Sequence, residues 1–199
     1  MRLTIHRGSR EIGGSCVELC AGDTRIILDV GMPLVRPGGA RFNMRDYREL
    51  TGPQLVERGV LPRIEGLYRW DSPSVAGVLI SHAHQDHHGF LRFVHPAIPI
   101  HMSEGTRKLM EISAVFMCGQ PGPPDNAVVF GWPSTFTIGA FTVTPHLVDH
   151  SAPSAFAFEV EADGKRVFYS GDFREHGYLG RALDVLYANA RPGADALLL

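Results

Sequence analysis

Residues 75–89 constrain the fold of this chain more than any other segment. Residues 75–80 form an apolar run with the composition of a buried strand, and it leads directly into Ser81-His82-Ala83-His84-Gln85-Asp86-His87-His88-Gly89. With ten histidines in 199 residues, chance would give this pattern of three histidines and one aspartate on the order of once in a thousand such chains. Imidazoles and carboxylates are common ligands of divalent metals. The segment therefore predicts a metal-binding loop at the end of a strand.

The spacing within this loop predicts two metal positions. His82 and His84 are two residues apart, so in an extended chain their side chains point to one side and can share one ion. Asp86 and His87 lie where the loop turns toward a short helix, and they can face a second ion beside the first. Zinc is the expected metal, with manganese, iron and magnesium as alternatives. His88 falls outside the pattern and is expected to be a neighbour or a solvent contact.

Two other β-prone runs end in the same kinds of residue. Asp149-His150-Ser151 follows the run at residues 141–145, and Asp172 follows residues 167–171. Each position alone would be weak evidence for a ligand. Together, three strand ends that carry histidine or aspartate predict that these residues meet at one shared edge of a sheet.

The rest of the chain alternates short β runs with a few helical stretches. Hairpin turns are expected at residues 21–23 and 163–164, where Gly and Asp cluster between β-prone runs. The remaining strand candidates are residues 3–6, 16–19, 24–28, 98–101, 127–130, 136–138, 155–161 and 166–170. Gly and Pro are numerous, at 22 and 14 residues, which favours many loops and short strands.

Two helices and one irregular segment are expected between these strands. Ser103 can cap a helix that continues to about Cys118, and its apolar face would carry Leu109, Ile112, Val115 and Phe116. A second helix is expected at residues 179–188. Residues 34–70 hold polar helical stretches at 44–50 and 54–58 and an excess of Arg, and this segment is expected to run over the surface in solvent.

Composition and cysteine usage limit the class of protein. The chain is 44% hydrophobic with a net charge of −2, as in an ordinary globular domain, so any nucleic-acid contact must come from a local basic patch. The three cysteines, Cys16, Cys20 and Cys118, are too few and too poorly spaced for a disulfide framework and indicate a reducing cytoplasm. No apolar run approaches the roughly 18 residues of a membrane span, and the first residues lack the apolar core of a signal peptide.

Residues 195–199, Asp195-Ala196-Leu197-Leu198-Leu199, resemble a buried strand that is cut in the middle. The expectation is that the chain is a piece of a longer protein. A natural terminus that is tucked into a sheet is the alternative.

Residues 81–89 resemble the metal loop of the metallo-β-lactamase fold superfamily. Leu28-Asp29-Val30-Gly31 resembles the first motif of that superfamily, His150 matches its third-motif histidine, and Ser170-Gly171-Asp172-Phe173-Arg174 matches its strand-ending, metal-bridging aspartate. The resemblance implies an α/β (α+β) fold, in which an αββα sandwich of two mixed β-sheets is flanked by helices. The site would lie on one edge of the two sheets.

A narrower resemblance connects the chain to the β-CASP nucleases, the group that includes ribonuclease J. Residues 8–16 are similar to the amino-terminal loop of that group, residues 149–156 look most like ribonuclease J, and residues 195–199 resemble the strand that leads into the β-CASP domain. The resemblance implies that residues 1–199 are one metallo-β-lactamase-like domain, truncated before a β-CASP insertion.

The resemblance also implies the ligand sets. One ion would be held by three histidines and the second by two acids and a histidine: His82, His84 and His150 for the first, and Asp86, His87 and bridging Asp172 for the second. The last histidine of the family pattern lies beyond the β-CASP insertion, and no position here matches it. Weak or absent occupancy of the second site is therefore expected.

These residues are compatible with three functions. The leading hypothesis is a hydrolase of RNA, or of single-stranded DNA, that uses a metal-bound hydroxide, with Asp86 orienting or deprotonating the water and Asp29 supporting the metal loop. The candidate phosphate contacts are Arg7, Arg10 and the Arg-bearing residues 36–69. Ser151 and Ser154 either end a turn, which is favoured, or hold a phosphate. The alternatives are a metallo-hydrolase of small thioesters or lactones, and a non-catalytic scaffold that binds nucleic acid. A homodimer of the full-length protein is left open.

Overall fold

The amino-terminal half of the chain builds the first of two mixed β-sheets. The computed structural model describes residues 1–117 and 119–199. In the first sheet, β1 to β3 are antiparallel neighbours, and β3 to β6 follow as parallel strands. The strands stand in chain order: β1 (Arg2–Arg7), β2 (Cys16–Ala21), β3 (Thr24–Leu28), β4 (Gly77–Leu79), β5 (Ile100–Met102) and β6 (Ala127–Val129).

The carboxyl-terminal half builds the second sheet, in which tight hairpins join β7 to β8 and β9 to β10. Asp163 and Gly164 both have positive φ, at 53° and 65°, which is the backbone that a two-residue hairpin turn requires. Neighbouring strands are antiparallel except β10 and β11. The order is β11 (Ala196–Leu198), β10 (Lys165–Tyr169), β9 (Ala155–Ala162), β8 (Phe141–Val148) and β7 (Phe136–Ile138).

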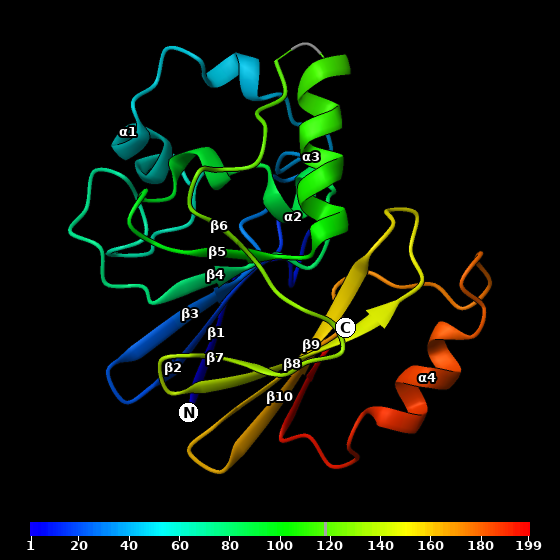
Figure 1. Cartoon of the computed structure of the whole chain (residues 1–199). Coiled ribbons are helices and arrows are strands. Elements are labelled where there is room, and N and C mark those ends of the chain that lie inside the picture. Colours follow the sequence, from blue (N-terminus) through cyan, green and yellow to red (C-terminus); the bar gives the residue numbers. More distant parts are fainter. Residues whose placement is uncertain (118) are drawn as a thin grey trace.

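Helices cover the outer faces of both sheets (Figure 1). The first sheet is covered by residues 42–68 and by α3, and the second by α4. The α-helices are α1 (Gly52–Glu57), α2 (Gln85–His88), α3 (Glu104–Phe116) and α4 (Ala182–Asn189), and 3-10 turns form at η1 (Met44–Tyr47) and η2 (Leu91–Phe93). The expected αββα sandwich of two mixed sheets is confirmed.

The core has one apolar layer between the sheets and one on each outer face. Leu19, Ile26 and Leu28 of the first sheet meet Phe141 and Phe158 of the second, and all five side chains are fully buried. Because strand side chains alternate between faces, Ile27 and Val78 pack instead against the helical layer. Two packed sheets place the ends of strands from both halves of the chain at common edges.

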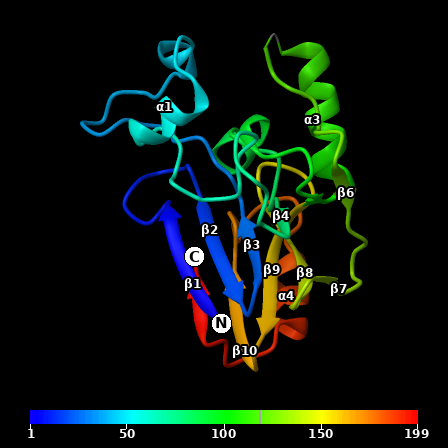
Figure 2. The same cartoon turned by 90° about the vertical axis from the view of Figure 1, so that its left-hand side faces the viewer.

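Residues 34–70 are not a solvated excursion, which corrects the expectation from the sequence. The side chains of Leu55, Leu61, Leu67 and Tyr68 are at most 2% exposed and belong to the core over the first sheet. Figure 2 shows the segment (cyan) above this sheet. The Arg side chains dominate the composition, but the apolar residues between them form the inner surface of the layer.

The prediction of which residues form the buried face of the helix after Ser103 is also wrong. Ile112, Val115 and Phe116 are 54%, 78% and 81% exposed, whereas Thr106 and Met110 are buried. Only the first turns of α3 lie over the sheet, and its later turns extend beyond it (Figure 1). Cys118, where this helix was expected to end, lies outside the described residues.

One smaller expectation is corrected as well. The strand β11 lies at the edge of its sheet, and Leu197 and Leu199 are 59% and 83% exposed, so this strand is not buried. The short helix expected near the histidine loop is present as α2, and the 3-10 turn η2 follows the loop. Cys16 and Cys20 both lie on β2 as free thiols.

Candidate metal centre

Four strand ends from the two sheets meet at one edge of the sandwich. The strand β3 leads to Asp29, β4 to the loop with His82 and His84, β8 to His150, and β10 to Asp172. Backbone bonds join these ends, because Asp29 N–H donates to Leu79 O (2.8 Å) and Phe156 N–H donates to Ser81 O (2.9 Å). The shared edge predicted from the sequence is therefore present.

Three imidazoles converge at this edge. His82 Nε2 lies 3.0 Å from His84 Nδ1, which lies 3.1 Å from His150 Nε2. The centroids of the three rings are 4.7–4.9 Å apart. His150 comes to the other two across 66 residues of sequence. Ligand nitrogens around a zinc ion stand about 2.0–2.1 Å from the metal, so neighbouring ligand atoms lie a little over 3 Å apart, close to the spacing found here.

A second cluster shares His82 with the first. One ligand atom each from His82, His87 and Asp172 lies within 4.8 Å of the others. His87 Nε2 is 3.3 Å from Asp172 Oδ1, and His150 Nε2 is 3.7 Å from Asp172 Oδ2, so the two oxygens of Asp172 face the two clusters. Asp86 Oδ2 lies at the rim, 4.0 Å from His87 Nε2.

The buried carboxylate of Asp29 accepts a hydrogen bond from His87 on the side of the imidazole ring opposite to Asp172. His87 Nδ1 donates to Asp29 Oδ2 at 2.6 Å, and Tyr169 Oη donates to the same oxygen at 2.6 Å. Ser81 donates twice, from its N–H to Oδ1 (2.8 Å) and from Oγ to Oδ2 (2.7 Å). Since Nδ1 of His87 is occupied by this bond, Nε2 is the nitrogen that faces Asp172. An acceptor that fixes the tautomer of an imidazole in this way is typical of metal-ligating histidines.

The segment after β3 also fixes the backbone of α2. Val30 N–H donates to His87 O (2.9 Å) and Met32 N–H to Gln85 O (3.0 Å), while Gly14 and Ser15 both donate to Asp86 O at 3.1 Å. This approach requires Gly31, because a Cβ at that position would stand 1.8 Å from Asp86 O. The backbone around Gly14 and Ser15 and the backbone around Gly31 therefore both come close to α2.

The charges of the cluster follow from burial and from the two acids. Burial, followed by the charge of neighbouring His87, lowers the pKa of His82 to about 3, so this imidazole is neutral at pH 7. Burial alone would lower the pKa of His87, but the carboxylates of Asp29 and Asp172 outweigh it and raise this pKa to about 10. The hydrogen bond with His87 lowers the pKa of Asp172 to about 2. Burial also lowers the pKa of His150.

These residues suit a divalent cation. His82, His84 and His150 offer three nitrogens that face one another, and they come from two distant segments. At most one proton can lie between each pair of these nitrogens, so a shared cation is a partner that satisfies all three imidazoles at once. His87 carries a proton that a second ion would have to displace.

Several other residues singled out in the sequence have different roles. Asp149 is turned away from the histidines and accepts from Leu179 N–H (3.0 Å) and Arg174 Nε (3.2 Å), so it holds the loop before α4. Arg7 is paired with Glu11, donates to Val60 O (2.7 Å) and lines a hollow together with His87 and Asp172, so its contact with a phosphate stays a prediction. His88 is buried, so it is a neighbour of the site and not a solvent contact.

Sequence reasoning missed Ser81 and Tyr169 as partners of Asp29. Tyr169 is the last residue of β10, three positions before Asp172, and a polar atom at the end of an otherwise apolar strand was the available signal. Ser151 Oγ lies 3.4 Å from His84 Nε2, and Ser154 has a φ of 57°, which fits the turn expected there.

The comparisons with known proteins agree with this arrangement. The model of the beta-lactamase superfamily domain matches residues 51–196. Ribonuclease J from Sinorhizobium meliloti is 28% identical over 143 residues, and transcription termination factor FttA from Methanothermobacter thermautotrophicus is 28% identical over 218 residues. These alignments cover 70% and 100% of this chain but only 25% and 31% of the relatives.

A solved structure shows the same fold over nearly the whole chain. It is described as a protein of unknown function from Enterococcus faecalis V583, and the match has a TM-score of 0.76 at 23% identity. The alignment covers 99% of this chain and 49% of that protein. No helix in the described part of the chain is both long and apolar enough to cross a membrane.

Proposed function

Because this chain belongs to the metallo-β-lactamase superfamily, we propose that it is the metal-binding part of a nuclease of the β-CASP type that hydrolyses phosphodiester bonds in RNA. The superfamily and the cluster at the sheet edge support a metal-dependent hydrolase. The observation that carries the proposal is the convergence of His82, His84 and His150, with Asp172 beside them. The likeness to ribonuclease J is the reason to choose RNA as the substrate.

In this proposal His82, His84 and His150 hold one divalent ion, and Asp86, His87 and Asp172 hold a second one more weakly. Zinc suits the three imidazoles best, with manganese, iron and magnesium as alternatives. A bound ion would lower the pKa of a coordinated water toward about 7 and would stabilise charge on a phosphoryl group. The side chain of Asp86 is 16% exposed, so it can accept a proton from water at the rim of the cluster.

A basic hollow next to the cluster supports a polynucleotide substrate. It has a volume of about 890 Å³, and its lining includes Arg41, Arg45 and Arg92 as well as Gln85, the residue before Asp86. Guanidinium groups bind phosphate oxygens through paired N–H donors. An RNA strand whose phosphates lie on these residues would approach the histidines from the side of α2. The free thiols of Cys16 and Cys20 suit a protein of the cytoplasm, where such a substrate is found.

The test uses the protein at the length that its gene encodes, because this chain spans only 25% and 31% of the two relatives. The protein is loaded with zinc or manganese and incubated with end-labelled single-stranded RNA and with DNA of the same sequence. The His84→Ala variant should cut RNA more than about 100-fold more slowly, since it removes a proposed metal ligand.

The matched control is His95→Ala, which removes a histidine whose Nδ1 only accepts from Ala97 N–H (3.1 Å). This control should cut RNA at the rate of the unmodified protein. The proposal fails if the unmodified protein cuts neither nucleic acid, or if His84→Ala and His95→Ala cut equally well. Hydrolysis of a thioester or lactone without cleavage of RNA would favour the small-molecule alternative.

A further inference from the structure

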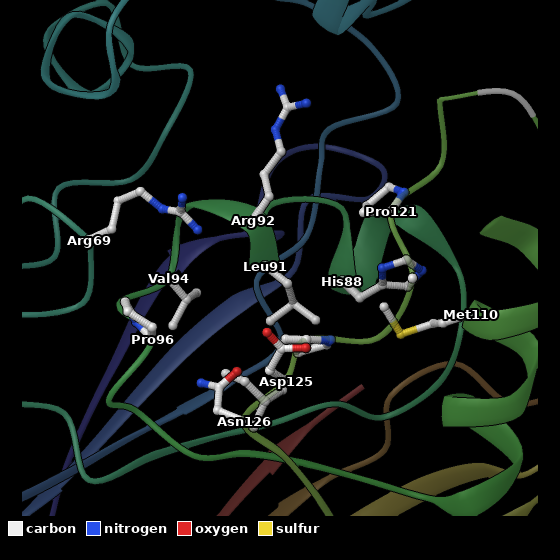
Figure 3. Close-up of a pocket in the computed structure, with 13 residues that line it drawn as sticks. Arg69, His88, Leu91, Arg92, Val94, Pro96, Met110, Pro121, Asp125 and Asn126 are labelled. Carbon is white, nitrogen blue, oxygen red and sulfur yellow. The ribbon is translucent and has the colours of Figure 1, made fainter.

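A cavity of about 420 Å³ lies on the side of α2 away from the metal-binding histidines (Figure 3). His87 and His88 are consecutive, but the first faces Asp172, whereas the second lines this cavity. The cavity is bounded by η2, α3, β5 and residues 121–126. Its volume lies in the range of about 300–1,000 Å³ that is typical of small-molecule sites.

The walls of the cavity are apolar. Leu91, Val94, Ile100 and Met110 line it, and all four side chains are at most 7% exposed. The buried imidazole of His88 adds a flat wall to the same cavity. Such a surface suits a planar heterocycle rather than a charged or strongly hydrated group.

Asp125 and Asn126, here called the floor of the cavity, offer hydrogen-bond acceptors, with Asp125 exposed and Asn126 half-buried. Figure 3 shows Asp125 and Asn126 side by side beneath Leu91. Asn126 donates from Nδ2 to Ile98 O, which leaves its amide oxygen as an acceptor. Asp125 forms no ion pair with any residue in the described part of the chain. A ligand that fits this floor must therefore present N–H donors.

The mouth of the cavity is basic. Arg69 and Arg92 are exposed lining residues, and Figure 3 shows Arg92 extending away from Asp125 and Asn126. Arg92 also lines the basic hollow described above, so the two spaces meet at this side chain. Guanidinium groups bind phosphate oxygens through paired N–H donors, so these two side chains suit the phosphate of a nucleotide.

We propose that this cavity binds a guanine nucleotide, with the base between the apolar walls and the phosphate on Arg69 and Arg92. Guanine has two adjacent donors, N1–H and the N2 amino group, which match the carboxylate of Asp125. Adenine presents a single amino group beside an acceptor on the same edge, and this acceptor would face the carboxylate. The nucleotide is an unpaired guanosine of the RNA substrate, and in this respect the inference rests on the proposed function.

The first test measures the binding of GMP, AMP and inorganic phosphate to the purified protein by isothermal titration calorimetry. GMP should bind at least about fivefold more tightly than AMP, because a bidentate pair discriminates between bases by that much or more. Asp125→Asn should remove this preference, since one of the two acceptor oxygens becomes a donor. Asp184→Asn, the same change at an exposed position on α4, should leave the preference intact.

The inference is wrong if GMP binds no more tightly than AMP or phosphate, or if Asp125→Asn keeps the preference for GMP. Arg69→Gln separates the phosphate contact from the base contact, because it should weaken GMP and AMP alike. The matched control is Arg2→Gln on β1, which should change neither affinity. Thermal unfolding of each variant shows whether it is folded before the titration is interpreted.

The second test identifies the source of the nucleotide. The affinity of oligoadenylate RNA is compared with that of the same RNA containing one guanosine. Tighter binding of the guanosine-containing RNA, lost in Asp125→Asn, supports RNA as the source, and equal binding overturns it in favour of a free nucleotide. RNA cleavage is measured separately. Selective GMP binding without cleavage would refute only the nuclease, whereas cleavage without GMP selectivity would refute only this pocket.

Discussion

The substitution Asp29→Asn tests how the metal loop is held. The carboxylate is fully buried and accepts four hydrogen bonds, from Ser81 N–H, Ser81 Oγ, His87 Nδ1 and Tyr169 Oη. Asparagine has the same shape and tolerates the left-handed backbone at this position, where φ is 58°. Its NH₂ group, however, would face at least one of these donors, and its neutral amide would leave protonated His87 without its buried counter-ion.

The magnitude follows from the loss of that ion pair. Removing one partner of a buried charge pair costs about 3–5 kcal/mol. Asp172 still faces His87, so we expect a loss of about 3 kcal/mol in the free energy of unfolding, measured by urea denaturation in EDTA. Loss of an outer partner of a ligating histidine also lowers metal affinity by about 10–100-fold. Competition with a chromogenic zinc chelator measures this second effect.

Asp163→Asn is the matched control, because Asp163 also has a positive φ, of 53°, but its half-exposed carboxylate pairs only with the amino terminus. We expect this control to change the free energy of unfolding by less than about 1 kcal/mol and to leave zinc affinity unchanged. If Asp29→Asn matched the control in both measurements, the carboxylate would not organise the loop and the reasoning would be refuted.

Three further predictions concern the fold around the site. Leu55→Ala should lower the free energy of unfolding, measured in urea, by about 2–5 kcal/mol, because Leu55 is 1% exposed. A loss below about 1 kcal/mol would contradict the burial of residues 34–70 against the first sheet. Burial alone would raise the pKa of Glu18, but its bonds with Arg25 and His6 together outweigh this and lower the pKa. The carboxylate therefore stabilises the fold above about pH 4.3 and loses this effect as pH falls through the folded-state pKa. The difference in unfolding free energy between the unmodified protein and Glu18→Gln should therefore shrink between about pH 6 and pH 3, and a constant difference would contradict the assignment. Gly31→Ala should lower the free energy of unfolding by about 1–3 kcal/mol and reduce the amount of bound zinc, measured by elemental analysis, because the new Cβ would displace Asp86. An unchanged zinc content would show that α2 tolerates the shift and would contradict this prediction.

The sequence was sufficient for the elements whose signal is local. The Asp163-Gly164 turn and the bounds of β3 at Thr24–Leu28 were predicted correctly, because two-residue turns and runs of branched residues determine them. The convergence of His82 and His150 was also predicted, because histidine and aspartate at the ends of several strands indicate that these ends meet at one edge of the sheet. The resemblance of residues 81–89 to a known metal loop added the ligand sets, which stay proposals.

The errors concern which face of a segment is covered, and this depends on contacts distant in sequence. Phe116 and Met110 are both apolar residues of α3, but only Met110 lies over β5 and β6, so periodicity alone could not show that the last turns extend beyond the sheet. Leu55 is buried because its helix is held against the first sheet, although its neighbours are polar. Tyr169 was missed as a partner of Asp29 because 140 residues separate them in the sequence.

X-ray absorption at the zinc edge tests the central claim most directly. The zinc-loaded protein should show nitrogen or oxygen ligands at about 2.0–2.1 Å, with the multiple-scattering signal of imidazoles. His150→Ala should lose part of that imidazole signal, because its Nε2 lies 3.1 Å from His84 Nδ1 in the cluster. A spectrum with sulfur at about 2.3 Å, or one that is unchanged in His150→Ala, would contradict a metal site built from His82, His84 and His150.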